Sequence, residues 1–196
     1  MKEDLLQTYL HQVVLFLNKK YSLSVQLIES SLNFTKEVAH WKNGRLIIDI
    51  RERGTMGTLF IVCHVFGHLV QYTTKKEYAP LLAVVNSRPL PLNLDNEFKE
   101  RYFAYEKEAF QIGKGLMEQV IPIDSELDKL YQIFMYADYE HFWQYLTTGH
   151  HLSRKEFHRR FTKTRRKLYG KINNPLPAIT PPDNLRLGGP IEIIVV

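Results

Sequence analysis

The sequence predicts an α+β fold in which a small antiparallel sheet is followed by helices only. Strand-like alternation of apolar residues is confined to residues 22–51, and helical periodicity recurs before and after that segment. The 196 residues suit one compact domain with a small helical appendage. The single cysteine excludes an intramolecular disulfide framework and, with an acidic N-terminus that does not resemble a secretory signal, favours a cytoplasmic location.

The first elements follow from local patterns. Apolar residues recur every three or four positions over residues 5–17, which predicts an amphipathic helix. Asn43-Gly44 separates two strand-like runs and indicates a hairpin, because both residues accept positive φ. Residues 56–74 are apolar on almost every side and predict a buried helix. Its most apolar stretch, residues 59–70, is too short to span a membrane, and no membrane contact is expected.

The rest of the chain is expected to be helical, with an extended tail. Helices are expected at 96–119, 124–136, 138–148 and 154–169, the last opened by a capping box of Ser153 and Glu156. The Pro-, Asn- and Gly-rich segment 172–190 predicts extended chain, and 191–196 an edge strand. The sequence is thus divided into a core (1–136), a basic helix-turn-helix-like region (137–171) and a tail (172–196).

The buried helix at 56–74 carries His64 and His68. Residues four apart share one face of a helix, so both imidazoles can reach one cation at about 2.0–2.1 Å. Two hydrogen-bonded core histidines would have the same spacing, and that alternative stays open. Gly67 would allow another helix or a substrate backbone to approach His68 closely. Cys63 is interpreted as an inert core thiol.

A tetrahedral zinc site needs a third ligand from another segment, and Glu106 is the best candidate. On the expected helix 96–119, Glu106, Ala109 and Gly113 lie along one stripe, and Glu108 points about 160° away from it. Small residues at 109 and 113 would let this helix pack tightly on the histidine helix and bring the carboxylate to the pair. The alternative is that Glu106 is a solvated surface residue, as most glutamates are.

Residues 45–72, followed by Glu106-x-x-Ala109 and Leu116-Met117, resemble the ImmA/IrrE family of zinc metallopeptidases. In that family an N-terminal helix and a small sheet precede a helix bearing His-Glu-x-Gly-His. A second helix supplies a glutamate in a Glu-x-x-Ala pattern, and a helical region follows. The resemblance covers roughly residues 1–120, with a weaker similarity over 138–168, and implies a zincin-like fold.

The resemblance implies one zinc ion per chain, held by His64, His68 and Glu106, and a regulatory partner such as a helix-turn-helix repressor. The sequence departs from the family at two positions. Val65 stands where the family has its catalytic glutamate, and Phe110 stands where the family has an asparagine. Valine cannot take a proton from zinc-bound water, and loss of a general base lowers the rate by about 10²–10⁴. We therefore expect a metal-binding regulatory protein with weak or no peptide hydrolysis, and assign no catalytic residue. Side chains that could replace the base are Tyr102, Tyr105, Glu108 and His40.

Residues 154–171 carry nine Lys or Arg and one Glu, a local charge of +8 in a chain whose net charge is +5. A helix, a glycine turn and a capped basic helix outline a helix-turn-helix, with Phe157, Phe161 and Leu168 facing the preceding helix. The alternative function is thus a DNA-binding or other nucleic-acid-binding transcriptional regulator, with the zincin-like core as scaffold. Contact with an acidic partner protein, or a solvated helix without a specific role, are the other interpretations. The residues expected to contact nucleic acid or a partner are Arg154, Lys155, Arg159, Arg160, Lys163, Arg165 and Arg166.

Overall fold

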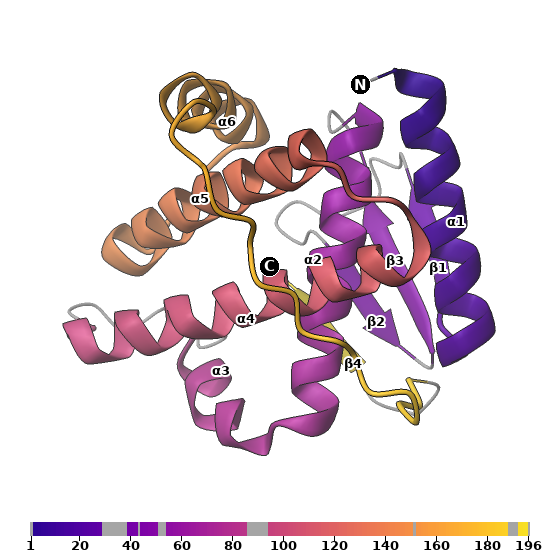
Figure 1. Ribbon diagram of the computed structural model, residues 1–196. Coiled ribbons are helices and arrows are strands. Elements are labelled where there is room, and N and C mark those ends of the chain that lie inside the picture. The colour runs from indigo at the N-terminus through magenta and orange to yellow at the C-terminus, as the bar shows by residue number, and fades with distance from the viewer. Residues whose placement is uncertain are drawn as a thin grey trace.

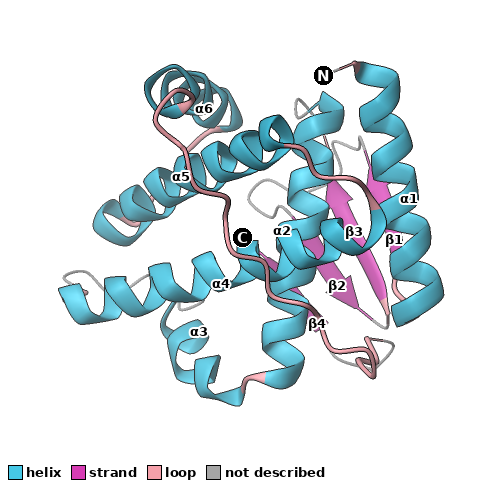
Figure 2. Cartoon of the chain, viewed as in Figure 1, coloured by secondary structure: helices cyan, strands magenta, loops and turns pink. Residues whose placement is uncertain are grey.

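The computed structural model describes residues 2–28, 39–42, 44–50, 54–85, 94–150, 152–187 and 192–195. It is mostly helical with one small sheet, as expected (Figures 1 and 2). In chain order the elements are α1 (Glu3–Tyr21), β1 (Ser24–Ile28), β2 (Ala39–Lys42), β3 (Arg45–Asp49), α2 (Gly54–Thr74), a short 3-10 helix (Lys76–Tyr78), α3 (Ala79–Val85), α4 (Asn96–Val120), α5 (Ser125–Thr148), α6 (Arg154–Leu168) and β4 (Glu192–Val195).

The sheet is mixed, with the strand order β1-β3-β2-β4. β2 and β3 form the predicted hairpin, in which Gly44 has a φ of 71° and Lys42 pairs with Arg45; Asn43 lies outside the described residues. β4 adds to the edge as an antiparallel partner of β2, as predicted. The expectation of an antiparallel sheet is wrong at β1, which pairs with β3 in parallel. Turn residues encode the local hairpin, whereas the pairing of β1 is non-local and no turn signal specifies it.

Helix α2 lies at the centre of the molecule. Every residue from Thr58 to Gln71 is buried, and α2 shares one hydrophobic core with Leu17 of α1 and Ile48 of β3. By length and composition α2 is apolar enough to cross a membrane, although 78% of that stretch is buried inside the fold. Apolar residues occur on every face of α2 because other elements of the fold cover the helix on every side.

Helices α2 and α4 approach each other through small residues, as the stripe on α4 predicted. A Cβ added at Gly67 would overlap the carbonyl of Ala109, and one added at Gly113 would lie 2.6 Å from the carbonyl oxygen of Cys63. The two helix backbones are therefore in direct contact at two successive turns. This contact sets the distance from which the Glu106 side chain reaches α2.

Helix α5 is continuous, and the expectation of two helices at 124–136 and 138–148 is wrong. The sequence has no glycine or proline near Ala137, so nothing interrupts the helix there. Helix α6 packs on α5 as predicted: the rings of Phe157 and Phe161 lie 5.8 and 6.2 Å from that of Phe134. The Ser153 side chain caps α6 by accepting from the backbone N–H of Glu156 at 3.2 Å. The division at residues 136 and 171 stays a prediction.

The segment 172–187 runs without regular structure across α5 and α4 (Figure 1). The backbone N–H of Ile179 donates to the carbonyl oxygen of Gln111 at 3.0 Å, and a Cβ at Gly115 would overlap the carbonyl of Ile179. The Lys114 ammonium, which lies 2.6 Å from Asp128, also donates to the carbonyl oxygen of Leu176. The tail is thus extended, as expected, and it is anchored to the core by buried contacts.

Candidate metal centre

His64 and His68 on α2 meet Glu106 of α4 inside the protein. One carboxylate oxygen of Glu106, Oε2, lies 3.1 Å from Nε2 of His64 and 3.2 Å from Nε2 of His68. The ligand atoms of the three residues all lie within 4.8 Å of one another. The three residues that the sequence singled out therefore form one group that could hold a metal ion.

The spacing of these atoms fits a small cation. Ligands placed tetrahedrally at 2.0–2.1 Å from a zinc ion are about 3.3 Å apart. The two separations from Glu106 Oε2, 3.1 and 3.2 Å, are close to that value. Two imidazoles and one carboxylate are also a common set of protein ligands for zinc.

Gln71 orients His68. The amide nitrogen of Gln71 donates to the carbonyl oxygen of Tyr105 at 2.8 Å and to Oε2 of Glu108 at 2.9 Å. Because both amide hydrogens are used, the Gln71 oxygen accepts a hydrogen from Nδ1 of His68, at 3.1 Å. When the His68 ring is neutral, its one proton is on Nδ1, so Nε2 has a lone pair that faces the Glu106 carboxylate. Two such acceptors face each other favourably only with a proton or a metal ion between them.

His64 is held in the form that a metal ligand needs. Burial and the neighbouring His68 lower the pKa of His64 to about 4, so its ring is neutral at neutral pH. Its Nδ1 lies 3.6 Å from Oδ2 of Asp138 on α5. That separation is longer than a hydrogen bond, and His64 Nδ1 has no hydrogen-bond partner among the described residues.

Glu106 keeps its negative charge although it is buried. Burial alone raises the pKa of the carboxyl, but in the metal-free protein the positive charge of a protonated His68 and hydrogen bonds from the histidines outweigh it. The pKa of Glu106 therefore lies below its usual range. The interpretation of Glu106 as a solvated surface residue is wrong, since only 1% of it is exposed.

Aromatic rings enclose the centre on two sides. Phe110 stacks on His64 with ring centroids 3.8 Å apart, and Tyr105 stacks on His68 at 4.8 Å. His64 and His68 are only 3% and 6% exposed. Structural zinc sites are completed by a fourth protein ligand, whereas the three residues of this group would leave one position of a tetrahedral ion for water or another ligand.

Three of the side chains at the centre cannot act as a general base. Val65 is fully buried and belongs to the hydrophobic core. Burial, together with the charge of Glu106, raises the pKa of Tyr102 and of Tyr105 well above the usual value. Both phenols therefore stay protonated and can donate a hydrogen bond but cannot accept a proton.

Glu108 supports the centre from outside. Its carboxylate accepts from Gln71 of α2 at 2.9 Å and from the Tyr78 hydroxyl at 2.9 Å. Lys75 forms an ion pair with the same carboxylate. Its oxygens are thus engaged in holding Gln71. The side chain of His40 lies outside the described part of the structure.

Two residues at the centre, Gln71 and Asp138, are absent from the candidates that the sequence analysis named. Gln71 is three positions after His68 and lies on the same helix face, so the sequence spacing could have identified it as a partner of His68. Asp138 is an acid among aromatic residues in the sequence, and only the packing of α5 shows that it lies beside His64.

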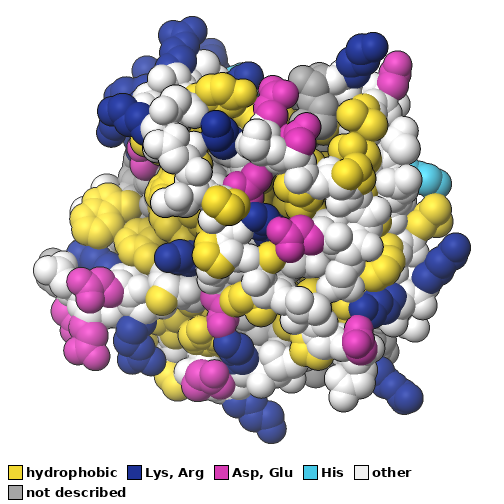
Figure 3. All heavy atoms as spheres, in the orientation of Figure 1, with side chains coloured by type: hydrophobic (Ala, Val, Ile, Leu, Met, Phe, Trp, Pro, Cys, Tyr) yellow, Lys and Arg dark blue, Asp and Glu magenta, His cyan; other side chains and the backbone are white. Residues whose placement is uncertain are grey.

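The basic residues of α6 are mainly on the surface, and Figure 3 shows Lys and Arg side chains gathered over this helix. Arg160 differs from the others, because it is half-buried and donates to Oε1 of Gln144 at 2.6 Å and to Glu156. The side chain of Arg154 lies outside the described residues. The remaining predicted contact residues are exposed: Lys155, Arg159, Lys163, Arg165 and Arg166.

Comparison with known proteins finds no relative of this chain. No family model and no curated protein matches the sequence, and no solved structure matches the fold. The functional interpretation therefore depends on the geometry of His64, His68 and Glu106 and on the motif that these residues form.

Proposed function

We propose that this chain is a zinc-binding regulatory protein of the ImmA/IrrE type that has weak or no peptidase activity. The single observation that carries the proposal is the contact of one Glu106 oxygen with Nε2 of both His64 and His68, at 3.1 and 3.2 Å, inside the core. One zinc ion per chain would be held by these three residues. Bound zinc would contribute to folding stability and would act as a Lewis acid on any ligand that reached it.

The loss of hydrolysis is proposed from two features of this chain. Val65 provides no group that can move a proton, and Phe110 and Tyr105 cover the imidazole faces. In such a centre the residues described here orient the ligands and exclude water. The protein would then act in the cytoplasm by binding a partner, such as a helix-turn-helix repressor, without cleaving it.

Metal content tests this function. We expect about one zinc ion per purified chain and its loss in the variant His64→Ala/His68→Ala. The matched control is His11→Ala/His158→Ala, which removes two exposed histidines from other helices. Glu106→Gln keeps the size of the third ligand and serves if the double variant does not fold. A wild-type protein that stays free of metal after zinc is supplied would show that the histidines are ordinary core residues.

A second function, binding of nucleic acid by α6, is favoured by the exposure of its cations. Five of the predicted contact residues lie on the solvent side of the helix, where they can neutralise phosphates. Arg159→Glu/Lys163→Glu should abolish duplex binding in a gel-shift assay, and wild-type binding should fall steeply with salt. Arg160 is unsuitable for this test, because it joins α6 to Gln144 of α5. If the double variant binds the duplex as tightly as the wild type, α6 is not the nucleic-acid-binding surface.

A further inference from the structure

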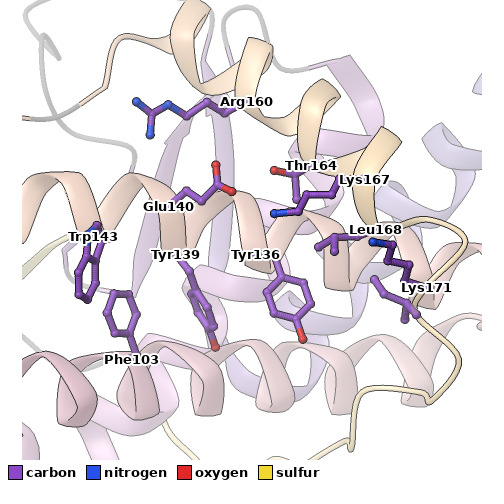
Figure 4. Close-up of a pocket in the computed structure, with 11 residues that line it drawn as sticks. Phe103, Tyr136, Tyr139, Glu140, Trp143, Arg160, Thr164, Lys167, Leu168 and Lys171 are labelled. Atoms are coloured by element: carbon purple, nitrogen blue, oxygen red, sulfur yellow. The ribbon is translucent and has the colours of Figure 1, made fainter.

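A groove separate from the metal centre lies between α4, α5, α6 and the start of the tail. Its volume is about 710 Å³, within the range of small-molecule sites. Figure 4 shows aromatic side chains of α4 and α5 on one side and side chains of α6 and the tail on the other. This groove lies on the side of α6 that faces α5, whereas the residues proposed to contact duplex nucleic acid face solvent.

The aromatic wall of the groove is unusually exposed. Trp143 is 51% exposed and Tyr136 is 40% exposed, and both line the groove. Phe103 of α4 stacks against Trp143 with ring centroids 5.9 Å apart and an interplanar angle of 19°, which fixes the indole in place. Rigid, exposed aromatic rings of this kind form a surface on which another planar ring can pack.

The opposite wall is cationic. Lys167 and Lys171 line it, and Figure 4 shows their ammonium groups near the end of the groove that holds Tyr136, away from Trp143. Arg160 also lines the groove, but its guanidinium is engaged by Gln144 and Glu156. Glu140 is the acidic residue among the groove's described lining residues, so the wall keeps a positive balance.

We propose that this groove binds a mononucleotide. The base would pack at the end formed by Trp143 and Phe103, and the phosphate would lie between Lys167 and Lys171 at the other end. Trp143 and Tyr136 are seven residues apart on α5, which places them about 10 Å from each other along the helix axis. That span corresponds to a nucleoside monophosphate from base to phosphate. The Glu140 carboxylate can accept a hydrogen bond from an amino group of the base.

The proposal is independent of metal binding, although the two sites are neighbours. Tyr139 lines the groove, and the charges of Glu106 and Asp138 contribute to its raised pKa, after burial. Its hydroxyl is buried and has no hydrogen-bond partner among the described residues. The Tyr139 ring packs against Phe103 of the groove, with ring centroids 5.5 Å apart, and against Phe110, which stacks on His64, at 6.5 Å.

Isothermal titration calorimetry with the four ribonucleoside monophosphates tests the proposal on the full chain. We expect saturable binding of at least one of them and at least a tenfold weakening in Lys167→Gln/Lys171→Gln. The matched control, Lys19→Gln/Lys107→Gln, removes the same charge from exposed positions of α1 and α4 and should change the affinity less than twofold. Trp143→Ala should also weaken binding tenfold, whereas Tyr72→Ala, which shortens another exposed aromatic residue, should not.

Three further outcomes would overturn the proposal. Inorganic phosphate that binds as tightly as the nucleotides would show that the aromatic wall contributes nothing. Equal weakening by the two lysine pairs would indicate general attraction of anions to the positively charged chain. Binding of a single-stranded oligonucleotide without binding of any mononucleotide would make the groove part of a strand-binding surface. Zinc content would be unaffected by these results, so the two functions are tested separately.

Discussion

Gly67 on α2 faces the carbonyl of Ala109 on α4 so closely that no Cβ fits between them. Ala109 is three residues, nearly one helical turn, from Glu106. The same contact that packs the two helices therefore sets the reach of the Glu106 carboxylate to His64 and His68. The packing of the two helices and the geometry of the candidate metal centre therefore depend on one interface.

Gly67→Ala should weaken both properties together. The added methyl group forces the helices apart, which costs about 1–3 kcal/mol in the free energy of unfolding. The displacement also moves Glu106, so zinc affinity should fall. Urea denaturation and a zinc titration measure the two effects. Gly170→Ala is the control, because a Cβ there has no neighbour within 4 Å; equal effects of the two variants would contradict this account of the interface.

Gln71→Met should lower zinc affinity about 10–100-fold, as loss of a residue that orients a ligand does in other sites. Methionine has a similar size but cannot accept the hydrogen of His68 Nδ1 at 3.1 Å. Competition with a chelator measures the affinity. Gln132→Met is the matched control, since Gln132 is equally buried but bonds Asp128 and the carbonyl of Asn174. We expect it to reduce stability and leave zinc affinity unchanged.

Val65→Glu should destabilise the protein without restoring peptide hydrolysis. Val65 is fully buried in the hydrophobic core, so a carboxylate there would have no solvent and no partner. The expected cost is about 3–5 kcal/mol, as for other unpaired buried charges. Thermal unfolding and hydrolysis of a fluorogenic peptide are the measurements, and Val65→Ala shows the smaller effect of a cavity alone. A folded variant that hydrolyses peptides when zinc is added would overturn the description of a buried centre.

The Cys63 thiol should be unreactive in the folded protein. It is fully buried on α2, and burial raises its pKa, so little thiolate is present at neutral pH. We expect a thiol reagent such as DTNB to label no cysteine in the native state and one per chain in denaturant. Rapid labelling of the native protein would indicate that α2 opens frequently or is less buried than described.

Lys114→Met should release the tail. Lys114 and Asp128 form a buried ion pair at 2.6 Å, so this substitution leaves the Asp128 carboxylate without its cationic partner and costs about 3–5 kcal/mol in the free energy of unfolding. It also removes the donor to the Leu176 carbonyl, so limited proteolysis should cut within 172–187 faster. Lys107→Met, on the exposed side of the same helix, should have little effect. If Lys114→Met/Asp128→Leu is no more stable than Lys114→Met, the ion pair is not the cause.

Much of the local structure follows from the sequence alone. Periodicity identified α1, α2, α4 and α6, and the Asn-Gly turn identified the hairpin of β2 and β3. The stripe of Glu106, Ala109 and Gly113 also identified the third residue of the group that could hold a metal ion. These features can be predicted because helix faces, caps and turns depend on residues only a few positions apart.

Other features depend on segments far apart in the chain. The parallel pairing of β1 with β3, the position of Asp138 beside His64 and the attachment of Arg160 to Gln144 have no local signal. The burial of the centre by Phe110 and Tyr105 is also a result of packing.

The sequence by itself determined which residues can bind a metal and that Val65 cannot act as a base. Only the tertiary structure decided that His64, His68 and Glu106 meet, that Gln71 orients one of them and that the centre is buried. The physical reason is that ligand type is a property of single residues, whereas distance and solvent exclusion arise when helices pack.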